Sequence, residues 1–176
     1  MTDVDVIKGL AIFLEKNVAS KIELKKPPEK GVISGEGSYE LVNPTVYKGW
    51  IPLKNLDEYN YSIPSIVVML DEGIDDNSDS TLNIRFKIAT YDPGETQEDG
   101  NVNLNGKGYM DLLNLMTKIR LELSQNPIIE EKISVNKPIK WSMDNQQSYP
   151  YWTANMSFTV SIAPLPFNTE KYQDYL

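Results

Sequence analysis

The chain has 176 residues and a mass of 20.0 kDa, which suits one globular domain and leaves no room for two catalytic domains. Its 25 acidic residues outnumber its 17 Lys and Arg residues, so the formal net charge is −8 and a phosphate backbone would be repelled. The absence of His and Cys excludes a Ser-His-Asp triad, a thiolate nucleophile, imidazole or thiolate zinc ligands and disulfides.

The first predicted element is a helix from Asp3 to about Val18. Its apolar residues recur at spacings of three and four, as on one helical face (Val6, Ile7, Leu10, Phe13, Leu14 and Val18). Thr2 or Asp3 is placed to cap it, and an acidic first turn suits the positive end of the helix dipole.

Residues 25–62 are interrupted by Pro and Gly, and we expect a long irregular segment without a regular element of any length. The segment is nevertheless too apolar for a solvated linker, so another surface must cover it. We therefore expect part of it to form a subunit interface, through Val32, Ile33, Tyr39, Leu41, Val46, Tyr47, Trp50 and Ile51.

Two strands follow. Residues 63–70 form a continuous apolar, β-branched run typical of a buried strand, and residues 82–89 alternate apolar with polar. The acidic connection at 71–79 is too short for a crossover helix, which predicts an antiparallel hairpin. Its charge predicts that the connection, like the acidic loop at 95–99, lies in solvent or in a lumen.

A second helix is predicted from about Gly108 to Gln125, with Gly108 as cap and Asp111 meeting free backbone N–H groups. Residues 137–143 are predicted to form a short strand. Residues 152–162 alternate strictly and give the clearest strand signal in the chain.

These elements predict one α+β domain over residues 1–167, followed by a C-terminal tail at 168–176. The sheet is expected to have four to five mostly antiparallel strands, with two amphipathic helices on one face, a polar opposite face and long loops between elements. In the tail, Tyr172 and Tyr175 either dock on a partner or fray.

No candidate site in the sequence supports catalysis. Asp75, Asn77 and Asp79 match the first positions of a calcium loop, but the required Gly falls at Ser80 and the bidentate Glu at Phe86. Acidic pairs such as Glu130 and Glu131 lie in polar surroundings, where a solvated face is the better interpretation. We predict no catalytic, cofactor-binding or metal-binding residues, hence no enzyme.

An ordered set of landmarks resembles a known family over Pro44 to Phe167. The set is Gly49-Trp50-Ile51-Pro52, Ile63-Pro64-Ser65-Ile66-Val67-Val68, Ala89-Thr90-Tyr91-Asp92, Gly108-Tyr109-Met110-Asp111-Leu112-Leu113 and Tyr149-Pro150-Tyr151-Trp152. It is similar to the tail-terminator, or tail-completion and collar, proteins of long-tailed phages of Gram-positive bacteria and of R-type bacteriocins.

The resemblance implies a hexameric ring of small α+β subunits at the head-proximal end of a phage tail or phage-tail-like particle. Such a ring stops growth of the tail tube and, in a contractile tail, meets the sheath protein. It implies no active site to transfer. The alternatives are a tail assembly adaptor or chaperone and a component of the head–tail connector.

The sequence has neither a basic-then-apolar leader nor an apolar run of about 18 residues, so we expect synthesis in the bacterial cytoplasm and no membrane partner. Assembly into a phage or phage-tail-like particle would follow. The other expected partners are further copies of the chain, the tube protein and, in a contractile tail, the sheath protein.

Overall fold

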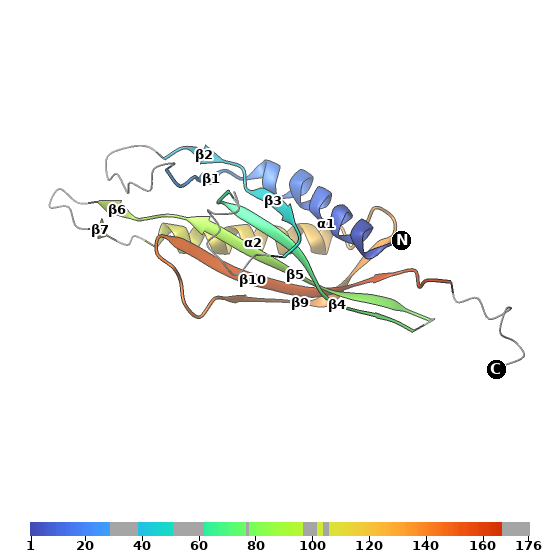
Figure 1. Ribbon diagram of the computed structural model, residues 1–176. Helices are drawn as coiled ribbons and strands as arrows, with labels where there is room; N and C mark the ends of the chain where they lie inside the picture. Colours follow the sequence, from blue (N-terminus) through green and yellow to red (C-terminus); the bar gives the residue numbers. More distant parts are fainter. Residues whose placement is uncertain (29–38, 51–61, 77, 97–101, 104–105, 167–176) are drawn as a thin grey trace, which may run out of the picture.

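The computed structural model describes residues 1–28, 39–50, 62–76, 78–96, 102–103 and 106–166 (Figure 1). The helical elements are α1 (Asp3–Asn17), the 3₁₀ turn η1 (Ala19–Lys21) and α2 (Lys107–Gln125). The strands are β1 (Leu24–Lys25), β2 (Leu41–Val42), β3 (Thr45–Lys48), β4 (Ser65–Asp75), β5 (Ser80–Tyr91), β6 (Glu95–Thr96), β7 (Val102–Asn103), β8 (Ile128–Ile129), β9 (Ile133–Met143) and β10 (Tyr151–Ile162).

The predicted α+β class is confirmed, but the predicted strand number is wrong. The main sheet has six strands in the order β3-β4-β5-β10-β9-β8, antiparallel except for the parallel β3–β4 pair. β1 with β2 and β6 with β7 form two small two-stranded sheets. The extra strands, β3 and β8, are too short for an alternating pattern to reveal them.

β3 corrects the expectation that residues 25–62 hold no regular element. Its Val46 is buried, and the strand follows β4 in register from Thr45 opposite Ser65 to Lys48 opposite Val68. The strand lies between Pro44 and Gly49, which is why its sequence looked irregular. Pairing with β4 therefore produces a strand here although the flanking Pro and Gly residues predict none.

Helix α1 begins and ends close to its predicted boundaries. Thr2 is its cap: the Thr2 hydroxyl accepts a bond from the backbone N–H of Asp5, while the Asp5 carboxylate accepts one from the Thr2 backbone N–H at 2.9 Å. This reciprocal arrangement is a capping box. It also holds the pKa of Asp5 below its ordinary value, chiefly through the bonds to Thr2.

The β4–β5 pair is the predicted antiparallel hairpin, but β4 continues to Asp75, so the acidic segment is mostly strand. Residues 71–76, 78 and 79 are exposed, as the charge pattern predicted. The Asp76 carboxylate accepts bonds from the Ser78 and Asp79 backbone N–H groups and from the Ser78 hydroxyl. These bonds close the turn. They also lower the pKa of Asp76, and the bond from the Asp79 backbone N–H is the largest cause. The hairpin projects past the start of α1, near the N-terminus, in Figure 1.

The cap predicted for the second helix is wrong. Gly106, in the left-handed conformation at φ 71°, precedes the first turn of α2, and no side chain caps the helix. Gly108 lies inside the first turn and is buried. Asp111 comes too late in the helix to reach the free N–H groups at its start.

One large apolar cluster contains residues of both helices and of the sheet, with Leu10, Phe86, Ile119, Met156 and Ile133 among its completely buried members. A smaller cluster joins Ile63, Ala89 and Tyr91, with Tyr39 and Tyr151 packed against it. Among the described residues, no helix is both long and apolar enough to cross a membrane.

Candidate functional site

Three of the five landmark stretches meet at the start of α2. Gly108 lies so close to its neighbours that a Cβ atom there would be 2.4 Å from two atoms of the Trp152 ring and 2.7 Å from the Asp92 Cβ. The Trp152 indole N–H donates to the Asp92 carbonyl at 3.3 Å, and the Thr90 hydroxyl donates to the Gly108 carbonyl at 3.3 Å. Lys25, from β1, reaches the same place. We call these five residues the Asp92 junction.

Asp92 is the electrostatic centre of the junction. Its side chain is 1% exposed, and one carboxylate oxygen accepts from Lys25 Nζ at 2.8 Å and from the Gly94 backbone N–H at 3.0 Å. The second oxygen, Oδ2, has no hydrogen-bond partner. Such a pair adds little net stability compared with an apolar filling, but removing only its cation would leave a buried charge, at a cost of about 3–5 kcal/mol.

Asp111, the residue predicted as a cap, stands near this buried charge instead. Burial, and then the charge of Asp92, raise the pKa of Asp111 above its ordinary value. Two carboxylates with different environments can serve acid–base chemistry. Here, however, Lys25 neutralises Asp92, and the close Gly108–Trp152 contact occupies the space beside it, so the junction is built for packing.

Tyrosines extend the junction toward β1 and β2. The Tyr91 ring contacts the rings of Tyr39 and Tyr151, with centroids 5.7 and 5.6 Å away, and Lys25 Nζ lies 5.4 Å from the Tyr39 centroid. Burial, followed by the neighbouring Tyr39, raises the pKa of Tyr91 well above its ordinary value. Tyr39, predicted at a subunit interface, thus packs within its own chain.

The other predicted interface residues that the structure describes divide into three groups. Val46 is buried in the core of its own chain and has no surface to offer a neighbouring subunit. The prediction that it lies at a subunit interface is therefore wrong. Tyr47 is partly buried, and its hydroxyl accepts from the Ser62 backbone N–H at 2.8 Å. Leu41 and Trp50 are 55% and 60% exposed. The predictions for Val32, Ile33, Ile51, Tyr172 and Tyr175 lie outside the described residues.

A polar network on the outward sheet face was missed by the sequence analysis. The Asp144 carboxylate accepts bonds from Lys87, Thr153 and Asn155. Burial on its own would raise the pKa of Asp144, but the bonds from these three side chains outweigh it and lower the pKa. The Gln147 side chain donates to the Thr153 carbonyl and accepts from the Thr153 backbone N–H. These bonds fix the connection between β9 and β10.

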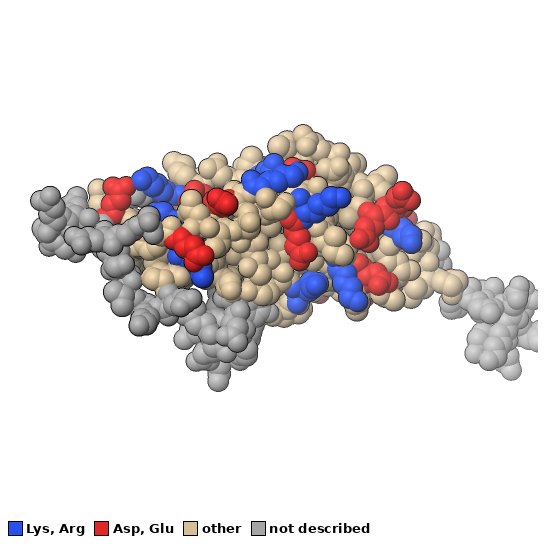
Figure 2. Space-filling model, turned by 90° about the horizontal axis from the view of Figure 1, so that it is seen from above, with Lys and Arg blue, Asp and Glu red and all other residues tan. Residues whose placement is uncertain are grey.

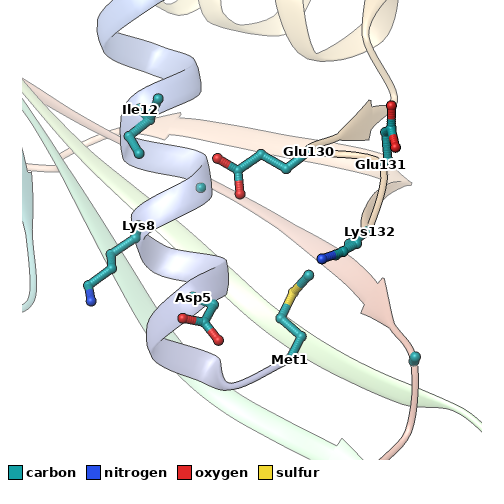
Figure 3. A pocket seen from close by; sticks show the side chains of 9 residues that line it. Met1, Asp5, Lys8, Ile12, Glu130, Glu131 and Lys132 are labelled. Carbon is teal, nitrogen blue, oxygen red and sulfur yellow. The ribbon is translucent and has the colours of Figure 1, made fainter.

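An open hollow of about 730 Å³ lies between α1 and the β8–β9 turn (Figure 3). Asp5, Lys8 and Ile12 line it from α1, opposite Glu130 and Glu131. Both glutamates have positive φ values, 50° and 58°, and are exposed. The described residues contain no group of three or more potential metal-binding side chains. The hollow is thus lined by charged side chains of both signs.

Basic and acidic side chains are interspersed on the face seen in Figure 2, among the described residues. That face offers no broad basic area for a phosphate backbone. No protein-family model and no curated protein sequence matches this chain.

Proposed function

We propose that this chain is a structural assembly protein whose copies form a hexameric ring. The ring caps the head-proximal end of a phage tail or phage-tail-like particle and ends polymerisation of the tube and, in a contractile tail, of the sheath. In this proposal the subunit carries both helices on one sheet face, acts without a cofactor and catalyses no reaction. It is made in the bacterial cytoplasm and meets the tube protein at the tail end.

The observation that carries the proposal is the convergence of the landmarks at the Asp92 junction. Three of the landmark stretches, which contain Asp92, Gly108 and Trp152, supply contacting residues although they are separated along the chain. These three stretches pack against one another. The residues that carry the resemblance thus lie together in the fold. This supports a shared subunit architecture and gives these residues structural roles.

Leu41 and Trp50 support self-association. Both are large, apolar and more than half exposed; Leu41 lies in β2, and Trp50 follows β3, which is an edge strand of the main sheet. The guanidinium carbon of Arg85 lies 5.2 Å from the Trp50 ring centroid, which is a cation–π contact. Tryptophan is a typical anchor residue of protein interfaces. A ring requires such a surface on every copy.

The mass of the protein in solution tests the assembly proposal. Light scattering should give a six-subunit species, and Leu41→Glu with Trp50→Ala should shift it toward the monomer. Leu121→Glu, which changes a similarly exposed residue on α2 (48%), should not. A wild-type protein that is monomeric at tens of micromolar contradicts the ring and favours the alternative of an assembly adaptor or chaperone. Co-purification with a capsid favours a head–tail connector component.

A further inference from the structure

The two edges of the main sheet are stepped. β3 borders β4 only from Ser65 to Val68, and β8 borders β9 only at Ile133 and Ser134. Among the described residues, no strand lies beside the outer edge of β4 from Glu72 to Asp75, or of β9 from Lys140 to Met143. Each end of the sheet thus lacks one edge strand, and the two ends lack it on opposite sides.

An exposed isoleucine stands at each edge of one end. Ile74 on β4 and Ile128 on β8 are 58% and 64% exposed. The strand pairing connects them through one row of directly opposed residues: Ile74, Thr81, Ser161, Ser134 and Ile128. Because directly opposed residues share a face, both isoleucines lie on the outward sheet face, at the same level on opposite edges. An exposed apolar residue on a sheet edge marks a place where another chain can pair.

The other end of the sheet carries a second matched pair. Lys48 on β3 and Trp141 on β9 are the ends of another row, which runs through Val68, Phe86 and Met156. Phe86 and Met156 are completely buried, so this row lies on the core face of the sheet. Lys48 is exposed, and Trp141 is 49% exposed. A lysine is a favourable neighbour for an indole ring, through its apolar stem and a cation–π contact.

The charges on the two stepped edges have opposite signs. β4 carries exposed Asp71 and Glu72 where β3 no longer covers it, and β9 carries exposed Lys137 and Lys140 where β8 no longer covers it. The glutamates of the β8–β9 turn lie past this region, where that turn faces α1 (Figure 3). Like charges keep two copies of the same edge apart, whereas the two unlike edges attract each other.

We propose that the main sheet continues from one copy of this chain into the next, with β3 of one copy beside β9 of its neighbour and β4 beside the neighbour's β8. Ile74 of one copy then lies opposite Ile128 of the next, and Lys48 lies beside Trp141. Each copy uses two different edges, which is the head-to-tail arrangement that a ring requires. The inference rests on the multimer of the proposed function, and it names the strands that join the copies.

Disulfide cross-linking tests this junction, because the chain has no cysteine of its own. Ile74→Cys and Ile128→Cys are made in separate chains, one of them enlarged by a tag, and the two chains are co-expressed and oxidised. Directly opposed residues on adjacent strands have Cβ atoms about 4.5–5.5 Å apart, so a small shift allows a disulfide. Within one chain the two residues are separated by four strand spacings, about 19 Å, so a bond reports two copies. The expected product is a reducible dimer of one tagged and one untagged chain.

Two controls define the register. Glu72→Cys lies on the same face of β4 as Ile74, two residues away, and should cross-link to Ile128→Cys several-fold less. Thr81→Cys lies at the level of Ile74 but one strand inside the edge, and should give only background. Glu72 is exposed and Thr81 is half-buried, so both substitutions are compatible with folding.

A charge exchange gives a second measurement. Ile74→Lys alone and Ile128→Glu alone each place a charge opposite an isoleucine of the neighbouring copy. Each should raise several-fold the protein concentration at which half of the multimer dissociates. With both substitutions in one chain, the two charges face each other across the junction and should recover most of the loss.

Three results would overturn the inference. One is a bond between positions 74 and 128 no stronger than the Thr81→Cys background. Another is stronger bonding from Glu72→Cys than from Ile74→Cys, which would refute the register. The last is a charge series without coupling, in which the loss in the double variant equals or exceeds the sum of the single losses. A wild type that remains a multimer in these cases refutes the junction and leaves the proposed ring standing. A monomeric wild type removes both.

Discussion

Gly108→Ala is the most informative single substitution, because two opposing effects can be weighed from the structure. Replacing Gly by Ala within a helix normally stabilises it by about 1 kcal/mol. At this position the new Cβ would lie 2.4 Å from the Trp152 ring and 2.7 Å from the Asp92 Cβ. Both distances are far below ordinary van der Waals contact, so the ring or the helix must move.

The ring cannot move freely. Trp152 donates to the Asp92 carbonyl and packs against the core cluster, and Asp92 is held by Lys25. Overpacking of this kind costs about 1–3 kcal/mol, and loss of the indole bond adds about 1 kcal/mol. After the helix gain is subtracted, we expect a net destabilisation of about 2 kcal/mol, or roughly 4–8 °C in Tm for a chain of this size.

Gly9→Ala is the matched control. Gly9 also lies in a helix, but its added Cβ would meet the ends of flexible side chains, Ile133 Cδ1 at 2.9 Å and Glu130 Oε2 at 3.1 Å. Small shifts relieve these contacts, so stability should be unchanged or slightly higher. Urea unfolding followed by far-UV circular dichroism measures both variants. A Gly108→Ala protein as stable as Gly9→Ala would refute the assigned packing of the junction.

Asp144→Asn should cost about 1–3 kcal/mol at neutral pH. Because the folded-state pKa of Asp144 is lowered, the wild-type advantage should be present above the ordinary pKa of 3.8 and be lost as the pH falls through the folded value. Asp111→Asn should instead raise the Tm at neutral pH. The raised folded-state pKa means that ionised Asp111 destabilises the fold, so the gain in Tm should disappear below pH 3.8. An unchanged or lower Tm of the variant at neutral pH would contradict this prediction. Asp75→Asn with Asp79→Asn should leave the Tm within about 1 °C, since both residues are exposed. A loss of several degrees, or stabilisation of the wild type by calcium, would show that the hairpin acids have a structural or metal-binding role.

The parts of the fold that the sequence predicts well are long and strongly periodic. The first helix, β5 and β10 each bury one face through a repeat that local spacing reveals. β3 and β8 carry too few residues for such a repeat. Their assignment depends on pairing with distant strands, which local patterns do not encode.

The Asp92 junction shows a similar limit for individual residues. Gly108 precedes an apolar helical pattern and so looked like a cap, whereas its role is to admit the Trp152 ring. Lys25 and Asp92 are 67 residues apart, and nothing in their local sequence indicates that they pair. The prediction that Val46 lies at a subunit interface was wrong. The local sequence of a short strand does not show whether a β-branched residue is buried by its own chain or by another subunit, and the answer depends on its partner strand.

The most direct test of the proposed function is the length distribution of tail particles, measured by electron microscopy in a strain from which the gene has been deleted. A ring that ends tube growth acts by covering an interface that would otherwise repeat without limit. Its loss should therefore give tails of variable and excessive length, restored to uniform length by the gene supplied in trans. Tails of normal length that lack a baseplate, or a complete absence of tails, would contradict the assignment.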